Sequence, residues 1–392
     1  MKRSNRRRAS LAMACAVCLA IFAASAIPES KPQPALIIDL KAHGMAADLF
    51  SDPREDRDQA RGLVTVFWTS PDRLVAAFNT SPRYTKPNHP EPFQVRVVVF
   101  DDAGKQQASR DWSFGTTGPE GDAMLALEPG PDQTILAVHL STAGVNGIPE
   151  GNLIQVLSQE LKLVQNFYVP SDSATVPSIP PGSSLVMEKA HASGGAVLEF
   201  FSGSPLKPHA SLSLAHQTET LAGPDEAAHL VCSKPDVCPE VQVTPVKGQQ
   251  WSYAEKPPLV PHPRAFLNAS TLLVEVEVPE KANRLLLLHA DASRTELPAL
   301  KSSDSVAAVA GVSADGSRFA LDFYGQSGLC GVVDFGCKHH ADARVFEVGN
   351  TSGNRILFEV PLAVQGGMSA LSPDGKHLAV LDRGKLLIYA LP

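Results

Sequence analysis

The last stretch of the chain, LSPDGKHLAVLDRGKLLIYALP (Leu371–Pro392), decides the fold. A turn cluster, an alternating run of small and large apolar residues, a second turn and a second apolar run follow one another directly. Ser-Pro-Asp-Gly favours a type I turn with a glycine available where the backbone needs a positive φ. Short apolar runs bounded by such turns are typical of β-strands. The stretch therefore predicts a β-hairpin at the end of the protein.

The same pattern recurs along the chain. VSADGSRFALDF (Val312–Phe323) is the clearest second copy, and TSPDRLVAAF (Thr69–Phe78) is the next. Each copy predicts a strand, a turn and a second strand, followed by a third strand such as QVRVVVFD (Gln94–Asp101). Weaker copies begin at Glu128 and Leu267, a degenerate one surrounds Ser193, and a further unit fits between Cys238 and Glu255.

Recurring units of about four strands are the signature of propeller blades. The copies return about every 60 residues, so we expect blades with longer loops than the usual units of about 40 to 50 residues. Leu153–Val164 is the best candidate for a helix, but it also divides into two alternating strands around Ser158, and we favour the strands. The sequence thus predicts an all-β fold over residues 35–392, a β-propeller of six or seven four-stranded blades.

An early strand is expected to close this ring. PALIIDLKAH (Pro34–His43) reads as an isolated strand with no unit of its own, whereas the last unit supplies three strands. Pairing the early strand with the C-terminal hairpin would complete the last blade. Closure removes free strand edges that would otherwise pair with other chains.

The SPDGKHLAV and SADGSRFAL elements resemble the WD-repeat-like propeller units of exported bacterial proteins, such as the periplasmic propeller that accompanies the Tol translocation machinery. The resemblance covers most of the mature chain patchily, and two copies match well. It implies a propeller fold and says nothing about chemistry. The Gly-His and Trp-Asp dipeptides of eukaryotic WD repeats are not present in register, so their blade-locking network is not implied.

The first 26 residues predict an export signal. A basic start precedes the apolar run Leu11–Ala23, and Ala24-Ser25-Ala26 offers small residues for cleavage. The apolar run is shorter than the roughly 20 residues of a membrane-spanning helix. We therefore expect a signal peptide over residues 1–26, a Pro-rich linker over 27–34, and an exported protein, periplasmic or extracellular, without a membrane span after cleavage. An uncleaved anchor would leave the domain on the same side.

Charge argues against a nucleic-acid partner. Losing the predicted signal removes five basic residues and no acidic one, which takes the formal net charge from −7 to −12. An acidic protein repels the phosphate backbone, and no basic stripe with interleaved aromatic residues compensates for it.

Four cysteines remain outside the predicted signal, in two local pairs. Cys232 and Cys238, and Cys330 and Cys337, are each close enough to form a disulfide in an oxidising compartment. The alternative is a four-cysteine zinc site. Zinc sites usually separate their paired cysteines by two to four residues, whereas five and six residues intervene here. We favour two disulfides.

The sequence predicts no catalytic residue, no cofactor site and no cofactor. It lacks the zinc-protease, phosphate-loop, dinucleotide and serine-elbow motifs. The weak metal candidates are His339, His340 and Asp342, in CKHHADAR (Cys337–Arg344). Adjacent histidines on a strand point to opposite faces, so both would reach one ion only from a loop. We favour a solvated loop pinned by the Cys330–Cys337 bridge, with no metal.

These observations favour a non-enzymatic exported propeller that binds a protein, peptide or glycan on one rim of the ring. The alternative is a metal-dependent propeller hydrolase, lyase or lactonase with its site in the central channel. A channel lined by histidines and carboxylates would indicate the enzyme, and an apolar or hydroxyl-lined channel would argue against it. A third hypothesis is an assembly module, which would expose a large apolar patch on a blade edge.

Overall fold

The structure is a computed structural model. It describes residues 32–46, 65–80, 93–114, 124–141, 151–169, 173–176, 178–190, 195–214, 219–234, 237–279, 281–301, 304–327, 338–349, 353–363 and 368–392. The chain divides into two units, Met1–Gln33 and Pro34–Pro392. The predicted signal peptide and most of the predicted linker lie outside the described residues, and everything below concerns the second unit.

The described residues form 28 strands in seven four-stranded antiparallel sheets, which we call blades. Blade 1 contains β2 (Thr65–Ser70), β3 (Arg73–Asn79), β4 (Phe93–Asp101) and β5 (Gln106–Phe114). Blade 2 contains β6 (Met124–Pro129), β7 (Ile135–Ser141), β8 (Gly151–Leu157) and β9 (Leu163–Val169). Blade 3 contains β10 (Ser173–Val176), β11 (Leu185–Ala190), β12 (Ala196–Ser202) and β13 (Lys207–Leu214).

Blades 4 to 7 continue the order around the ring. Blade 4 contains β14 (Thr220–Ala222), β15 (Glu226–Val231), β16 (Glu240–Pro245) and β17 (Trp251–Ala254). Blade 5 contains β18 (Val260–Asn268), β19 (Thr271–Glu277), β20 (Arg284–His289) and β21 (Arg294–Glu296). Blade 6 contains β22 (Ser305–Val312), β23 (Arg318–Ser327), β24 (Lys338–Glu347) and β25 (Arg355–Pro361). Blade 7 contains β26 (Met368–Leu371), β27 (His377–Asp382), β28 (Lys385–Ala390) and β1 (Leu36–Asp39).

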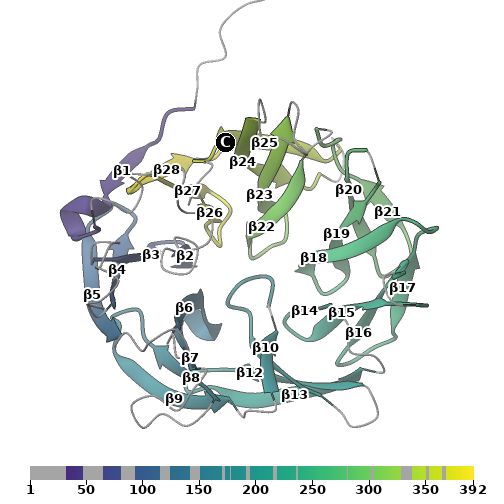
Figure 1. The fold of residues 1–392 in the computed structure, drawn as a ribbon, viewed down its shortest axis with the longest axis horizontal. Coiled ribbons are helices and arrows are strands. Elements are labelled where there is room, and N and C mark those ends of the chain that lie inside the picture. Colours follow the sequence, from purple (N-terminus) through teal and green to yellow (C-terminus); the bar gives the residue numbers. More distant parts are fainter. Residues whose placement is uncertain are drawn as a thin grey trace, which may run out of the picture. The chain divides into compact units, whose positions relative to one another are not determined.

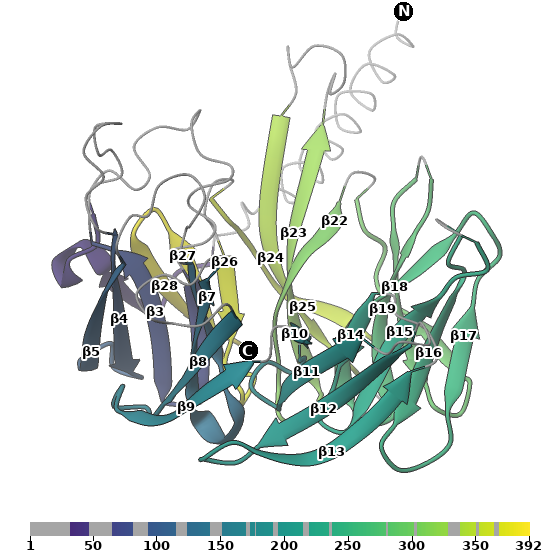
Figure 2. The same cartoon turned by 60° about the horizontal axis from the view of Figure 1, so that its bottom comes forward.

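The blades are arranged around a centre, and the first strand of each blade lies innermost (Figure 1). Helical structure in the described residues is limited to short 3₁₀ turns, η1 (Leu40–His43) and η3 (Pro131–Gln133). The predicted all-β propeller is therefore confirmed, with seven blades. Seen from the side, β23 and β24 of blade 6 extend beyond the neighbouring strands (Figure 2).

Most of the predicted strands lie where the pattern placed them. The stretch Leu153–Val164 falls in two strands, β8 and β9, and the unit between Cys238 and Glu255 supplies β16 and β17 of blade 4, which brings the number of blades to seven. The predicted position of the copy around Ser193 within its blade is wrong. It leads into β12, a third strand, whereas the turns of the other copies lie between the first and second strands. Its apolar run matched the pattern, but its loop is a different connection.

The repeated turn is held by its own side chains. In blade 7 the Ser372 hydroxyl donates to Asp374 at 2.6 Å and accepts from the backbone N–H of His377 at 2.9 Å. The same pair recurs as Ser313 and Asp315 in blade 6, at 2.7 Å. Gly316 completes that turn with a φ of +69°, and a Cβ there would lie 2.4 Å from the carbonyl oxygen of Leu267 in blade 5. The turn therefore also packs one blade on the next.

The core lies between neighbouring blades rather than inside any one of them. Alternate side chains of a strand enter two different clusters. Val75 and Ala77 of β3 pack with residues of blade 2, while Leu74 and Phe78 pack with residues of blade 7. Burying both faces of each sheet explains the near-continuous apolar runs of the second and third strands.

The predicted closure is confirmed. Strand β1 pairs antiparallel with β28, with Leu36 opposite Ile388 and Ile38 opposite Leu386. These first and last strands lie side by side in Figure 1. The predicted strand Pro34–His43 is shorter than expected, because the chain turns into η1 after Asp39, whose carboxylate accepts from the N–H of Lys41 at 3.0 Å.

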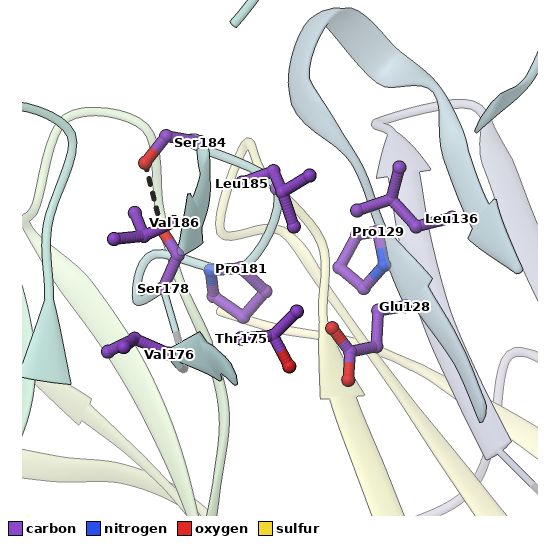
Figure 3. A pocket seen from close by; sticks show the side chains of 11 residues that line it. Glu128, Pro129, Leu136, Thr175, Val176, Ser178, Pro181, Ser184, Leu185 and Val186 are labelled. Carbon is purple, nitrogen blue, oxygen red and sulfur yellow. Dashed lines mark hydrogen bonds between the residues drawn. The ribbon is translucent and has the colours of Figure 1, made fainter. Parts of the chain in front are cut away.

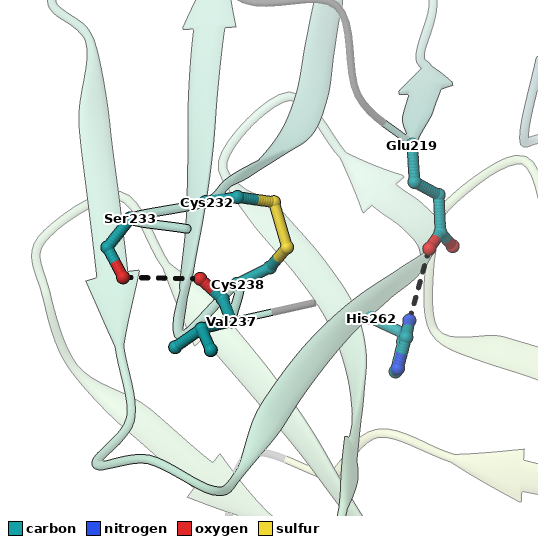
Figure 4. Close-up of a disulfide and its surroundings, with 6 residues drawn as sticks. All are labelled: Glu219, Cys232, Ser233, Val237, Cys238 and His262. Carbon is teal, nitrogen blue, oxygen red and sulfur yellow. Dashed lines mark hydrogen bonds and ion pairs between the residues drawn. A yellow bond between two sulfur atoms is a disulfide. The ribbon is translucent and has the colours of Figure 1, made fainter. Parts of the chain in front are cut away.

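Cys232 and Cys238 form a disulfide that closes the connection between β15 and β16 (Figure 4). Within the same loop, the N–H of Ser233 donates to the Val237 carbonyl at 3.0 Å. The second predicted pair, Cys330 and Cys337, lies outside the described residues. In the described part of the chain, no helix has the length and hydrophobicity that crossing a membrane requires.

Candidate functional site

The connection between β10 and β11 enters the centre of the ring, where Figure 1 shows it projecting inward. We call residues 178–184 the channel segment. The N–H of Ile179 donates to the carbonyl of Ala222 in blade 4 at 2.9 Å, and the N–H of Phe266 in blade 5 donates to the Ile179 carbonyl at 3.4 Å. The segment thus reaches from blade 3 across the inner strands of two further blades.

Hydrogen bonds from serine side chains, and packing of Gly182 against the turn of blade 2, hold the channel segment in place. The hydroxyls of Ser178 and Ser183 lie 2.8 Å apart, and the Ser184 hydroxyl donates to the Gly223 carbonyl at 3.3 Å. Gly182 has a φ of +78°, and a Cβ there would lie 3.1 Å from the carbonyl oxygen of Gly130. A larger residue at this position would be strained and would press on the turn of blade 2.

A cavity near the centre, which we call the large cavity, has a volume of about 640 Å³. The inner strands β2, β6, β22 and β26 line it, together with the turns that follow them and the channel segment. Four hydroxyls, one amide and two carboxylates are the polar side chains of this lining, and no histidine, lysine or arginine is among the described lining residues. These polar residues are Thr65, Thr69, Ser183, Ser369, Gln133, Glu128 and Asp132.

Two of these polar residues have an unusual backbone. Asp132 and Gln133 adopt φ values of 51° and 61°, in the left-handed region that non-glycine residues rarely occupy. Gln133 is held there by Gln159, whose amide donates to its side-chain oxygen at 2.9 Å. Backbone conformations of this kind gather at ligand sites more often than elsewhere. The turn therefore fixes a carboxylate and an amide at the edge of the large cavity.

A second cavity of about 210 Å³ lies between blades 2 and 3 (Figure 3). It shares Glu128, Pro129, Pro181 and Gly182 with the large cavity, so the two are contiguous. In Figure 3 the Glu128 carboxylate and the Thr175 side chain face one another from β6 and β10. The two sides of the cavity thus come from different blades.

Glu128 is the charged group of this second cavity. Its side chain is in contact with the cavity, yet the surrounding protein replaces enough water to raise the pKa of its carboxyl above the ordinary value. No described residue donates a hydrogen bond to the carboxylate or pairs with it. The carboxylate therefore lacks a counter-charge within the described protein.

A third cavity of about 230 Å³ lies between the inner strands of blades 4, 5 and 6, where the charges are already paired. Arg264 donates from Nε to the buried carboxylate of Glu275 at 2.9 Å. Glu219 accepts from His262 at 3.1 Å, as Figure 4 shows, and this hydrogen bond raises the pKa of His262 and lowers that of Glu219. This side of the centre leaves less free charge for a ligand.

The predicted metal candidates lie on β24, not in the solvated loop we favoured. His340 and Asp342 come together with Asp304, which precedes β22, and their ligand atoms lie within 4.8 Å of one another. His339 points the other way, as expected for neighbours on a strand, and stacks on Tyr324 with ring centroids 5.7 Å apart. The structure therefore joins two of the three candidates and adds Asp304, which the sequence analysis missed.

A guanidinium already occupies the centre of this acidic group. Arg344 is 2% exposed, and its Nη2 donates to Asp304 at 2.6 Å and to Asp342 at 2.9 Å. It also lies 4.3 Å from the ring centroid of Phe323. His340 is hydrogen-bonded to the other Asp304 oxygen at 2.9 Å. A divalent cation would have to displace the arginine from both carboxylates, so this donor set does not fit a resident metal.

The pKa values of Asp304 and Asp342 are shifted in opposite directions, because their partners compensate for burial to different extents. Burial by itself would raise the pKa of Asp304, but hydrogen bonds from His340 and Arg344 outweigh it and hold the pKa below its ordinary value. Burial also raises the pKa of Asp342, and there Arg344 does not fully compensate, so the pKa stays above its ordinary value. The cluster is an ion-paired network that joins β22 to β24.

No family model matches the chain, and no curated protein matches it. Solved structures do show similarity. An uncharacterized protein of Listeria monocytogenes EGD-e is 8% identical, with 84% of this chain and 94% of that chain covered and a TM-score of 0.47. The WD40 domain of SCAP from fission yeast is 10% identical over 84% and 95% of the two chains, with a TM-score of 0.37. Hydrazine synthase of Kuenenia stuttgartiensis is 12% identical over 65% and 72%, with a TM-score of 0.39.

Proposed function

We propose that this chain is a non-enzymatic β-propeller that binds a polypeptide segment of a partner protein in its central cavity. The observation that carries the proposal is the cavity of about 640 Å³, together with the contiguous one of about 210 Å³. Residues from five blades and the channel segment contribute to them, and their described lining offers two carboxylates with no basic residue. Pockets with apolar walls and a few placed polar groups are typical ligand sites.

A polypeptide suits this lining better than a glycan. A sugar carries a hydroxyl on most of its ring carbons, and burying one without a hydrogen bond costs free energy. Here several of the polar groups are already engaged, because Ser183 is hydrogen-bonded to Ser178, and Ser369 donates to Asp322. The aromatic residues of the lining, Phe67 and Trp68, are 7% and 6% exposed, so neither offers an open face for stacking. Apolar side chains of a peptide need fewer polar partners.

The same lining argues against hydrolysis by a side-chain nucleophile. A serine or threonine hydroxyl needs a neighbouring base to become nucleophilic. No histidine, lysine or cysteine occurs among the described residues of the large cavity. Among the described residues, the metal-dependent alternative depends on the Asp304 group, in which Arg344 takes the position of a cation.

We further propose that the protein acts outside the cytoplasm, in the periplasm or beyond the cell. The basic and apolar start of the sequence supports export, and a disulfide between Cys232 and Cys238 suits an oxidising compartment. The likeness of its turns to the Tol-associated propeller is compatible with a partner in the cell envelope. Mass spectrometry of the protein from its host would test this, with a mature N-terminus near residue 27 as the expected result.

Selection from a random peptide library against the purified full chain tests the binding proposal. Selected peptides should lose at least about tenfold in affinity for Thr65→Trp, which fills the large cavity from β2. They should bind Ser109→Trp normally, because Ser109 is exposed on β5, the outer strand of the same blade. Peptides that bind both variants equally, or a library that yields none, would refute the proposal.

Metal analysis tests the alternative. One tightly held divalent ion per purified chain, lost in an Asp304→Asn variant, would favour the enzyme. Our account predicts that the chain retains no such ion after dialysis.

A further inference from the structure

The cavity of about 210 Å³ between blades 2 and 3, which we call the Glu128 pocket, has the dimensions of one long side chain. At about 30 Å³ per water, its volume equals that of about seven waters. The side chains of lysine and arginine contain five and seven heavy atoms, respectively, beyond Cα. A drug-sized ligand usually needs a larger pocket of about 300 Å³ or more. The pocket therefore suits a single inserted residue.

Apolar and polar groups share the wall of the pocket about equally. Pro129 and Pro181 are the more accessible apolar residues of this wall, whereas Leu136, Leu185 and Val186 are nearly inaccessible (Figure 3). Long basic side chains pack their methylene stems along such surfaces while their charged ends reach a polar group. An aliphatic stem is what these walls would accept.

The polar groups of the pocket are hydrogen-bond acceptors, which suits a cation as the ligand. Glu128 supplies a carboxylate, and Thr175, Ser178 and Ser184 supply hydroxyl oxygens. Ser178 and Ser184 lie 3.3 Å apart, and each oxygen keeps a further lone pair for a donor. No positively charged side chain is among the described lining residues of this pocket or of the large cavity. An anionic ligand would meet an unbalanced carboxylate and no donor of opposite charge.

We infer that the Glu128 pocket takes a lysine or arginine side chain of the bound polypeptide, with the Glu128 carboxylate as its counter-ion. The inference rests on the proposed function and names the residue type by which the partner is recognised. The raised pKa of the free carboxyl has the same origin, because the surrounding protein displaces water from a side chain that is still exposed to the cavity, and the described residues supply no counter-charge. An ammonium or guanidinium supplies that compensation with strong, charge-assisted hydrogen bonds.

A double-mutant cycle tests this pairing. Full-chain Glu128→Gln keeps the shape of the side chain and removes its charge. Its affinity for a selected peptide is compared with that of the unchanged protein, and the same pair is then measured with the peptide's lysine or arginine replaced by norleucine. We expect Glu128→Gln to lower the affinity for the basic peptide by about 30-fold or more. The affinity for the norleucine peptide should stay within about threefold of that of the unchanged protein.

Two further variants keep the test decisive. Asp132→Asn removes the other carboxylate of the large cavity, which does not line the Glu128 pocket, and its effect should be independent of the peptide's basic residue. Thr175→Lys places a cation opposite Glu128 from within the protein, and it should weaken basic peptides as strongly as Glu128→Gln does. Thermal unfolding of each variant checks that it is folded.

The outcomes separate this inference from the proposed function. If peptides bind and Thr65→Trp blocks them, but Glu128→Gln affects basic and norleucine peptides equally, the pairing is wrong and the binding function stands. If no peptide binds the central cavity, both fail. We expect the preference for the basic peptide over the norleucine peptide to be lost in Glu128→Gln and retained in Asp132→Asn.

Discussion

The serine and aspartate side chains of the repeated turn explain why Ser-x-Asp recurs in this chain. In blade 1 the Ser70 hydroxyl donates to Asp72 at 2.7 Å, and this bond holds the pKa of the carboxyl below its ordinary value. The pKa of Asp315 is also lowered, by hydrogen bonds from the Ser313 hydroxyl and from the Ser317 backbone N–H. Because these carboxyls are ionised and hydrogen-bonded, the turn keeps its shape without support from a ligand or a metal.

A buried carboxyl between blades 6 and 7 gives the molecule a predicted pH dependence. Asp322 accepts hydrogen bonds from the N–H and the hydroxyl of Ser369. Burial nevertheless raises the pKa of Asp322 from 3.8 to about 6. The folded protein thus holds this proton more tightly than the unfolded chain between those two values. The stabilising contribution is complete below pH 3.8 and is lost as the pH rises through about 6.

We therefore expect Asp322→Asn to flatten the pH dependence of stability. At pH 7 the variant should be more stable than the unchanged protein by about 3 kcal/mol, with the amide oxygen accepting from the Ser369 N–H and the amide nitrogen donating to the Ser369 hydroxyl. Urea unfolding at intervals between pH 4 and 7 measures this difference. Parallel curves for the two proteins across that range would show that Asp322 does not titrate as described.

The Arg344 network predicts that two arginine substitutions lower the free energy of unfolding by very different amounts. Arg344→Met leaves Asp304 and Asp342 buried without their main counter-charge, and it should lower the free energy of unfolding by about 3 to 5 kcal/mol. Arg355 pairs with Glu347 at 2.7 Å but is 61% exposed. Arg355→Met should cost less than about 1 kcal/mol. Equal losses in chemical denaturation would contradict the role given to Arg344.

Single residues also mark how far the sequence predicted the site. His340 and Asp342 were candidates because they lie close together in the chain, whereas Asp304 is 36 positions away from His340 and carries no local signal. Arg344 ended the quoted motif, but nothing in the sequence indicated that it lies between two carboxylates. Glu128 was part of a recognised turn copy, and its unpaired environment depends on residues from blade 3.

At the level of elements, local patterns predicted strands and turns more reliably than connections. Apolar alternation identified β8, whose side chains enter the cores on both of its faces, and β9, an outer strand that remains largely exposed. The channel segment was missed because its Ser- and Pro-rich sequence resembles an ordinary turn. Its position depends on bonds from Ile179 to Ala222 and Phe266, which are remote in the sequence.

The disulfide is predicted to have a local effect. Cys232 and Cys238 close one short connection within blade 4, six positions apart. On the chain-entropy model, replacing both with serine lowers the free energy of unfolding by about 2.5 kcal/mol. The double variant should remain a folded propeller with unchanged circular dichroism, and guanidinium unfolding would show the loss. Failure to fold would mean that this bond supports more of the ring than its hairpin.

At the scale of the whole molecule, function depends on a closed ring. The large cavity takes its lining from blades 1, 2, 6 and 7, so it exists only if blade 7 lies beside blade 1. Contacts across this junction include Trp68, whose indole N–H donates to the carbonyl of Ala370 in β26 at 3.1 Å. The sequence predicted closure because β1 had no other partner, but it could not predict the size or charge of the centre that closure creates.

An engineered disulfide between β1 and β28 tests ring closure most directly. Ile37 and Leu387 lie opposite each other in the register, a separation of about 4.5 to 5.5 Å between Cα atoms for antiparallel strands. In Ile37→Cys/Leu387→Cys we predict complete disulfide formation in the folded protein, seen by non-reducing peptide mass spectrometry. Ile37→Cys/Leu163→Cys, which pairs β1 with blade 2, should keep both thiols free. Free thiols at residues 37 and 387 in the folded protein would contradict the closed propeller.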